Sequence, residues 1–369
     1  MVKKVKTGPS PVIKARITRC RRLMKKHAIG AHLVTGQRDC FYLTGFTGED
    51  SAVILTPKAV HILSDGRFDE AINQECPWVT RWMRRGSLVA EIAKASKELG
   101  IKKLAVQPEH MTLADHAELK KLNRATKLAP APPLTATMRR TKDDSELASI
   151  REAIRIAEEA FVAARATIRA GQTERGLAAR LEFEMRQRGA SAAAFTSICA
   201  EGANSALPHA HTGDRPIKRG SVMLVDWGAV VGGYRSDLTR TLFVGTIPPD
   251  LGRAYRTVLE AQQRAFAAIR PGARVCDVDA AARNFVREAG FGDAFNHGLG
   301  HGLGLDVHEP PSLSWRSTEK LQAGMVVTVE PGVYLPGVGG VRLEDDCLVT
   351  QTGCRVLSGL GKSLDDAVL

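Results

Sequence analysis

The stretch SVMLVDWGAVVGGYRSDLTRTLFVG, residues 221–245, decides the fold of the second half of this chain. Two apolar runs rich in Val, Leu and Thr flank the pair Gly232-Gly233, a pattern that is typical of a β-hairpin. If the turn centres between residues 231 and 232, Asp226 and Asp237 are equally far from it and face each other across the two strands, about 5 Å apart at their Cα atoms. Both side chains would then point to the same side of the sheet.

The two facing aspartates would be unfavourable neighbours. Carboxylates this close repel each other, and one of them should take up a proton unless a cation lies between them. Two exposed aspartates on a hairpin would be the simpler interpretation, but each of these two lies within apolar β sequence. We therefore predict a metal ion beside Asp226 and Asp237.

A second hairpin of the same construction follows near the C-terminus. The apolar strands MVVTVEPGVYL (residues 325–335) and VRLEDDCLVT (residues 341–350) flank the turn PGVGG, and Glu330 and Glu344 are equally far from a point within that turn. A buried acidic pair is unfavourable for folding and is hard to explain by surface solvation. The alternation of side chains along a strand places the next residue, Asp345, on the other face.

The segment between the hairpins, FNHGLGHGLGLDVHEPP (residues 295–311), holds three of the ten histidines of the chain. These are His297, His301 and His308, and the glycines around them let backbone and side chains approach a common centre closely. A single histidine is more often a packing residue than a ligand, but three within twelve positions favour a site.

The two acidic pairs and one imidazole form a set of mainly oxygen donors, with enough negative charge to balance two divalent ions. Carboxylate-rich ligation suits manganese (Mn2+), with Co2+, Fe2+ or Zn2+ as alternatives. Two such ions can polarise a peptide carbonyl and activate water at neutral pH, which predicts metal-assisted hydrolysis. Competing motifs are incomplete: HExxH, GxGxxG and GxSxG do not occur, and the P-loop-like VLSGLGKS has Val356 in place of its first glycine.

The length of 369 residues predicts two domains. The Pro/Ala-rich stretch APAPPLTAT at 129–137 disfavours both a helix and a central strand, and is the best candidate for the domain boundary. Before it, an amphipathic helix at 15–27 and short strands alternate, with a hairpin turn at 56–58, which suits a three-layer α/β domain. After it, a long helix extends to about Arg169, and further helices and strands form an α+β domain.

The net charge of +12 is concentrated at the N-terminus. Residues 1–30 hold ten basic side chains and no acidic one, which leaves +2 for the remainder of the chain. A local excess of this kind is typical of a solvated surface, so we do not expect nucleic acid as a partner. The chain shows neither the apolar core of a signal peptide nor a run of about 18 apolar residues, which predicts a cytoplasmic protein without a membrane partner.

At these residues the chain resembles the pita-bread-fold metallopeptidases of peptidase family M24, in the branch of Xaa-Pro aminopeptidase (aminopeptidase P) and Xaa-Pro dipeptidase (prolidase). The matching segments follow the family's order along essentially the whole chain: FYLTGFTGEDSAVIL, SDGRF, LPHAH, VDWG, GYRSDLTRT, HGLGHGLGLDVHE, TVEPGVY and GVRLEDD. The resemblance implies a smaller three-layer α/β creatinase-like domain at residues 1–134, which includes the basic segment, and an α+β pita-bread catalytic domain at residues 135–369.

The resemblance also implies roles for individual residues. The metal ligands would be Asp226, Asp237, His301, Glu330 and Glu344, with Asp237 and Glu344 touching both ions. His209 and His308 would flank the substrate and steady the tetrahedral intermediate, while Glu330 would relay a proton from the attacking water. The substrate pocket would also include His297, Tyr334 and Arg342, although a surface strand arginine is the simpler interpretation of Arg342.

The first activity that the resemblance implies is release of the N-terminal residue from peptides with proline in second position. Cleavage of Xaa-Pro dipeptides is the close alternative, because the loops that receive the substrate's C-terminus cannot be placed from the sequence. Short proline-containing peptides would be the substrates, and a homodimer or homotetramer the assembly. The alternative of another class is a metal-free pseudoenzyme that binds protein or RNA, against which the retention of every ligand argues.

Overall fold

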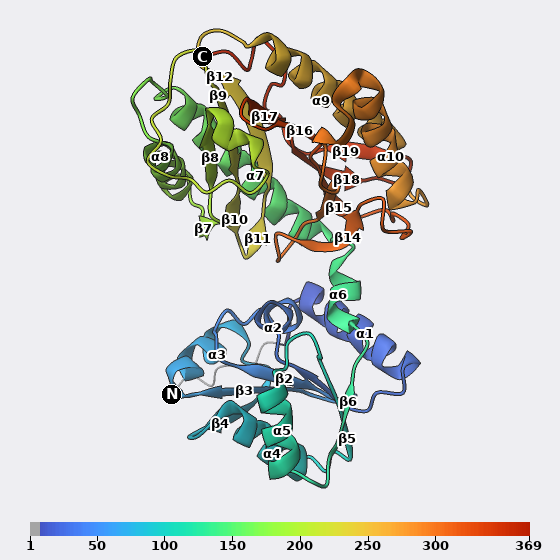
Figure 1. The fold of residues 1–369 in the computed structure, drawn as a ribbon. Coiled ribbons are helices and arrows are strands. Elements are labelled where there is room, and N and C mark those ends of the chain that lie inside the picture. The colour runs from blue at the N-terminus through green and yellow to red at the C-terminus, as the bar shows by residue number, and fades with distance from the viewer. Residues whose placement is uncertain (1–7) are drawn as a thin grey trace. The chain divides into compact units, whose positions relative to one another are not determined.

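The computed structural model describes residues 8–369, which form two compact units that divide between Arg139 and Arg140 (Figure 1). The basic residues at positions 3, 4 and 6 lie outside the described part of the chain. None of the helices formed by residues 8–369 is long and apolar enough to span a membrane.

The first unit alternates helices and strands along the chain. Its elements are α1 (Pro11–Lys26), β1 (His32–Val34), α2 (Gln37–Thr44), β2 (Ala52–Leu55), β3 (Val60–Asp65), α3 (Asp69–Glu75), β4 (Thr80–Arg84), α4 (Leu88–Glu98), β5 (Lys103–Val106), α5 (Leu113–Leu122), β6 (Lys127–Pro130) and α6 (Leu134–Arg139).

A six-stranded sheet with the order β4-β3-β2-β1-β5-β6 forms the centre of this unit. The predicted hairpin is confirmed, since β2 and β3 pair antiparallel with Leu55 opposite Val60. α1 begins earlier than the predicted 15–27, because the hydroxyl of Ser10 accepts a hydrogen bond from the N–H of Ile13 and caps the helix at Pro11.

The Pro/Ala-rich stretch at 129–137 is more ordered than the sequence predicts. Its first residues continue β6, which is an edge strand, but its second half forms the helix α6, so the prediction that it disfavours a helix is wrong. Pro132 and Pro133 immediately precede Leu134, and proline is tolerated at the start of a helix, where its missing N–H has no intrahelical partner in any case.

The second unit contains two successive sets of two helices followed by strands. The first set is α7 (Asp144–Arg165), α8 (Glu174–Gln187), β7 (Ala192–Ala193), β8 (Ile198–Glu201), β9 (Val222–Trp227), β10 (Ala229–Val231), β11 (Tyr234–Arg235) and β12 (Leu238–Phe243). The second set is α9 (Pro249–Ala268), α10 (Val275–Val286), β13 (Gly300–Gly302), β14 (Glu309–Leu313), β15 (Val326–Val329), β16 (Gly332–Leu335), β17 (Gly339–Arg342), β18 (Asp345–Val349) and β19 (Cys354–Val356).

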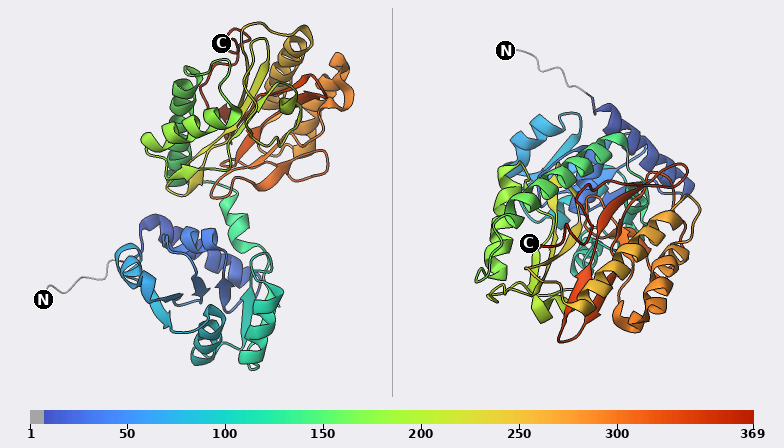
Figure 2. Two further views of the ribbon diagram at one scale, coloured as in Figure 1. Left: turned by 60° about the vertical axis from the view of Figure 1, so that its left-hand side comes forward. Right: turned by 90° about the horizontal axis from the view of Figure 1, so that it is seen from above.

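The strands of the second unit lie between the helix pair α7–α8 and the helix pair α9–α10, as Figures 1 and 2 show. α7 begins at a capping box, in which Asp143 and Glu146 each accept from the other's backbone N–H, and it ends at Arg165 rather than near Arg169. One apolar core packs α7 and α8 against β9 and β12, and another packs α9 and α10 against β15 and β18. The predicted combination of an α/β N-terminal domain and an α+β C-terminal domain is confirmed.

The first hairpin has a different register from the predicted one. Its two-residue turn is Gly232-Gly233, both with positive φ, so that Asp226 pairs with Thr239 and not with Asp237. The shift is by two residues, which preserves the face, and Asp237 is therefore a diagonal neighbour of Asp226 on the same side of the ladder. The prediction of directly opposite aspartates is wrong, whereas the prediction of a shared face is correct.

The second hairpin has the predicted register. β16 pairs with β17, with Val333 opposite Val341, and the same numbering continues where β15 pairs with β18. Glu330 and Glu344 lie between these two ladders, at positions that the common register makes equivalent. An isolated bridge between Thr239 and Glu344 connects this hairpin to β12 of the first set.

Candidate metal centre and substrate cavity

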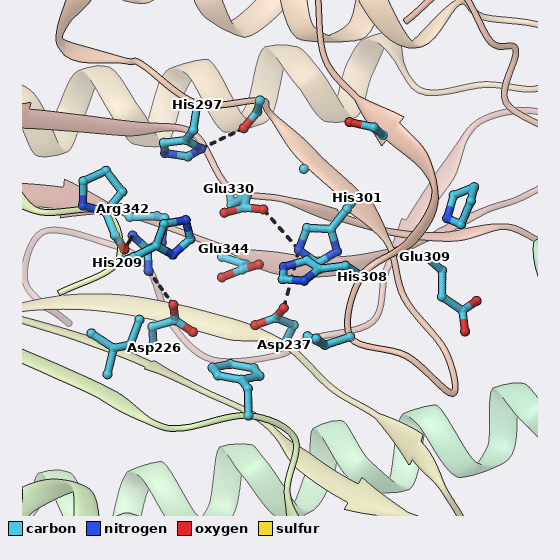
Figure 3. Close-up of a pocket in the computed structure, with 18 of the residues that line it drawn as sticks. His209, Asp226, Asp237, His297, His301, His308, Glu309, Glu330, Arg342 and Glu344 are labelled. Atoms are coloured by element: carbon cyan, nitrogen blue, oxygen red, sulfur yellow. Dashed lines mark hydrogen bonds and ion pairs between the residues drawn. The ribbon is translucent and has the colours of Figure 1, made fainter. Parts of the chain in front are cut away.

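A cavity of about 870 Å³ lies in the second unit where the strands of its two sets meet (Figure 3). The walls contain nine of the ten predicted site residues, namely His209, Asp226, Asp237, His297, His301, His308, Glu330, Arg342 and Glu344. In Figure 3 the four carboxylates and the ring of His301 point toward one another. Tyr334 stands behind this wall and contacts it through hydrogen bonds.

Ligand atoms of Asp237, His301 and Glu344 lie within 4.8 Å of one another, which is close enough for a common metal ion. The Nε2 atom of His301 is 3.6 Å from Asp237 Oδ2 and 3.4 Å from Glu330 Oε1. The other ring nitrogen, Nδ1, lies 3.1 Å from the carbonyl oxygen of Gly302, to which it can donate. This contact leaves Nε2 free of hydrogen and directed at the carboxylates, as metal ligation requires.

Two threonines that the sequence analysis missed hold the ligands in place. Thr239 donates to Glu344 over 2.6 Å, and the hydroxyl of Thr328 both accepts from the N–H of His301 and donates to Glu330. Each threonine lies two residues from an acidic ligand, so the period of a strand places it on the same face. That period is the signal by which they could have been found.

Arg342 joins Asp226 to the pocket wall. Its guanidinium forms an ion pair with Asp226, donates to the hydroxyl of Tyr334 over 2.9 Å and donates to Thr239 over 3.1 Å. The Tyr334 hydroxyl is also 2.9 Å from Nε2 of His297. Only 3% of Arg342 is exposed, so the interpretation as a surface arginine is wrong.

The electrostatics of the cluster are those of carboxylates forced together away from water. Burial, followed by the nearby charge of Glu344, raises the pKa of Asp237 well above its usual value. Burial also raises the pKa of Glu344 well above its usual value and that of Glu330 to about 8. Burial lowers the pKa of His301 to about 4, which keeps its ring neutral at pH 7. Such a cluster is stabilised by cations and destabilised by their removal.

An oxygen of Asp226 that is unpartnered within residues 8–369 is a second indication that the acidic cluster can hold divalent metal ions. The Oδ1 atom of Asp226 is buried and has no hydrogen-bond partner among the described residues, although its other oxygen is paired with Arg342. A buried carboxylate oxygen without a donor is unfavourable unless a cation meets it. The donor set of four carboxylates and one neutral imidazole matches the ligand preferences of Mn2+ and its neighbours in the first transition row.

His209 and His308 lie at the cavity wall and are both exposed. The ring of His308 contacts that of His301 edge-on, with 4.3 Å between their centroids. In contrast, Asp345 is not part of the cavity wall: it pairs with Arg240 and Lys362, in agreement with its predicted position on the other face. Glu309, which the sequence analysis missed, also lines the cavity but is paired with Lys142.

The comparisons with known proteins match both units. Residues 148–351 match the model of metallopeptidase family M24, and residues 16–141 match the creatinase/prolidase N-terminal domain. The Xaa-Pro dipeptidase of Pyrococcus horikoshii is 34% identical over 355 residues, which cover 96% of this chain and 99% of that protein.

Solved structures of similar proteins extend over nearly the whole chain. The Xaa-Pro dipeptidase from Bacillus anthracis superposes with a TM-score of 0.93 at 36% identity and covers 97% of this chain and 100% of its own. The X-Pro aminopeptidase from Thermotoga maritima superposes with a TM-score of 0.89 at 35% identity, covering 95% and 100%. These matches confirm the predicted family, fold class and hydrolytic activity on peptides. The chain therefore belongs to metallopeptidase family M24, and its peptidase domain follows a creatinase/prolidase N-terminal domain.

Proposed function

We propose that this protein is a metal-dependent Xaa-Pro dipeptidase, which hydrolyses the bond between a first residue and a C-terminal proline. The observation that carries the proposal is the cavity lined by the acidic cluster. It occurs in a chain whose similar proteins include Xaa-Pro dipeptidases from Pyrococcus horikoshii, Pyrococcus furiosus and Bacillus anthracis. Of the two activities that the sequence suggested, these names favour the dipeptidase over the aminopeptidase.

We assign the metal ligands to Asp226, Asp237, His301, Glu330 and Glu344, with manganese as the expected metal. When bound, a pair of divalent ions would polarise the scissile carbonyl and activate water. The protein contributes the fixed orientation of these ligands: Thr239 holds Glu344, Thr328 holds Glu330, and the carbonyl of Gly302 holds the ring of His301.

The remaining site residues act on the substrate. Glu330 is assigned the relay of a proton from the attacking water, since a carboxylate at the cavity wall can both accept and return it. His209 and His308 are exposed at the wall, and as hydrogen-bond donors they would stabilise the negative charge that develops on the carbonyl oxygen. His297 and Arg342 belong to the cavity wall that bounds the substrate, and the hydroxyl of Tyr334 connects the two from behind that wall.

Hydrolysis of Ala-Pro compared with that of Ala-Pro-Ala tests the proposal, with protein that has been stripped by a chelator and reloaded with Mn2+. Ala-Ala serves as the control for proline selectivity, and stripped protein as the background. We expect rapid cleavage of Ala-Pro alone. Cleavage of neither proline peptide would refute the proposed function.

Xaa-Pro aminopeptidase is the second candidate, because the Thermotoga maritima aminopeptidase is nearly as similar in structure as the Bacillus anthracis dipeptidase. Preferential release of alanine from Ala-Pro-Ala in the same assay would select it. The two activities differ in whether the proline carboxylate or a continuing peptide chain is received beyond the scissile bond.

A further inference from the structure

The helix α10 carries a buried ion pair outside the metal cluster. Both oxygens of the Asp279 carboxylate accept from the guanidinium of Arg283, one turn later, over 2.7 Å each. The Asp279 side chain is fully buried, and 14% of the Arg283 side chain is exposed. An arginine in this bidentate geometry has a fixed orientation, because both groups are planar and joined at two points.

This pair binds the backbone of the segment that leads to His301. Arg283 donates to the carbonyl oxygens of Phe295, over 2.7 Å, and of His297, over 2.6 Å. Asp279 accepts from the N–H of Leu299 over 3.2 Å. Three alternate residues of an irregular segment are thus held through their main chain, in the manner of a neighbouring strand, although no strand is present there.

The same guanidinium is enclosed by two aromatic rings. Its Cζ atom lies 4.1 Å from the ring centroid of Phe295 and 4.3 Å from that of Trp315. Trp315 belongs to the turn in which the N–H of Ser317 donates to the carbonyl of Ser314, and Ser317 lines the substrate cavity. Arg283 therefore connects two separate parts of the cavity wall, the segment of His297 and the turn of Ser317.

We propose that Arg283, oriented by Asp279, is a positioning residue for substrate binding: it fixes His297 and the 314–317 turn at the wall of the cavity. The inference rests on the proposed function, since it assigns this wall to a proline-containing peptide. Its effect reaches the substrate through His297, whose Nε2 atom contacts Tyr334. The side chains of Glu344 and Glu330 have their own supports in Thr239 and Thr328, so the effect of Arg283 is expected in substrate binding.

The test compares Arg283→Lys with a matched control, Arg264→Lys. Lysine keeps the positive charge beside Asp279 but cannot hold two carbonyl oxygens and stack between two rings at once. Arg264 on α9 also pairs with an acidic residue one turn away, Glu260, and its Cζ atom lies 3.9 Å from the ring centroid of Phe285. None of these three residues lines the cavity. The control thus reproduces an ion pair and a cation–π contact without the connection to the site.

Steady-state kinetics with Ala-Pro and Mn2+-loaded protein give the first readout. For Arg283→Lys we expect KM to rise about tenfold with kcat within about threefold of the wild type, because a misplaced wall weakens binding more than it changes the reacting groups. Arg264→Lys should leave both constants unchanged. An unchanged KM, or a fall in kcat that exceeds the rise in KM, would overturn the assignment.

Histidine-selective NMR gives a second readout that needs no activity. The ring resonances of His297, identified with the variant His297→Gln, should shift in Arg283→Lys and stay in place in Arg264→Lys. If the wild type cleaves no proline peptide, the proposed function fails, and this spectrum alone decides whether Arg283 positions His297. Resonances that coincide in the wild type and Arg283→Lys would refute the positioning role.

Discussion

Arg342 and Asp226 form an ion pair with both side chains largely buried, at the edge of a cluster that holds three further carboxylates. Arg342 supplies one fixed positive charge there, and it is attached by hydrogen bonds to both Tyr334 and Thr239. The pair leaves the other oxygen of Asp226 buried and without a donor among the described residues, so Arg342 orients this carboxylate in addition to offsetting its charge.

Replacement of Arg342 by methionine should affect both stability and activity. The variant leaves Asp226 buried without its cation, which should lower the free energy of unfolding of the metal-free protein by about 3 kcal/mol. Hydrolysis of Ala-Pro should fall by about a hundredfold, since the orientation of Asp226 is lost. Chemical denaturation and steady-state kinetics measure the two effects. Arg274→Met, which breaks an exposed pair with Asp277, is the control, and equal effects of the two substitutions would contradict the assignment.

Replacement of Asp237 by asparagine should affect metal binding and the stability of the metal-free protein in opposite directions. Activity should fall by at least about a hundredfold and the affinity for Mn2+ should drop, because a central ligand loses its charge. The metal-free variant should unfold at a higher temperature than the metal-free wild type, because one of several mutually repelling carboxylates has become neutral. Calorimetry and titration with Mn2+ measure these changes, and Asp277→Asn is the control. Wild-type activity in Asp237→Asn would refute the metal centre.

The metal-free protein should lose stability as the pH rises. The pKa of Glu330 is raised by burial to about 8 in the folded state, above its ordinary value of 4.5, so the folded state holds this proton more tightly than the unfolded state. The stabilising contribution is complete below pH 4.5 and is lost as the pH rises through about 8, with a slope of up to about 1.4 kcal/mol per pH unit for this group.

Thermal unfolding of chelator-treated protein between pH 5 and pH 8.5 measures this dependence. Burial lowers the pKa of His301 from its ordinary value of 6.5 to about 4. The contribution of the neutral His301 ring to stability is therefore complete above pH 6.5 and is lost as the pH falls toward 4. Glu330→Gln should have a flatter profile in the alkaline part of the range. Identical slopes for the variant and the wild type would show that Glu330 does not hold a proton in the metal-free protein.

Trp227 follows Asp226 directly and is the largest of the fully buried side chains among residues 8–369. Its ring stacks on that of Phe161 with 4.3 Å between centroids, and its Nε1–H donates to the carbonyl of Ala157 over 2.9 Å. Trp227→Phe removes that hydrogen bond and part of the buried volume, so we expect a loss of about 1 to 3 kcal/mol in the free energy of unfolding. The folded variant should retain the KM of the wild type, because Trp227 points away from the cavity. Denaturation and kinetics test both statements.

The acidic pairs could be predicted from the sequence because a charged residue is conspicuous within an apolar strand, and because the two-residue period of a strand predicts which face it occupies. Glu330 and Glu344 obey the predicted register, and so does the face of Asp226 and Asp237. The pairing of Asp226 was predicted wrongly because the position of a two-residue turn was taken one residue too early. Both Gly232 and Gly233 have positive φ, which selects a turn centred on that pair.

Other features of the site depend on contacts between residues far apart in the chain. Two examples are the ion pair of Arg342 with Asp226 and the hydrogen bond from Arg283 to the carbonyl of His297. No local sequence pattern indicates either contact, because only the folded backbone brings these groups together. The helix α6 was missed for a different reason: the prolines before it indicate a loop, although they are compatible with the first turn of a helix.

The bridge between Thr239 and Glu344 joins strands that are 105 residues apart in sequence. A chain must close a loop of that length before the two acidic pairs meet, so the centre comes into being late in folding, after both sets of helices and strands have formed. Metal ions that bind at this centre do not bind the chain early in folding, because their ligands are still apart, and so they cannot nucleate folding. Their influence falls on the reverse process, and the protein saturated with metal should unfold more slowly while it folds at an unchanged rate.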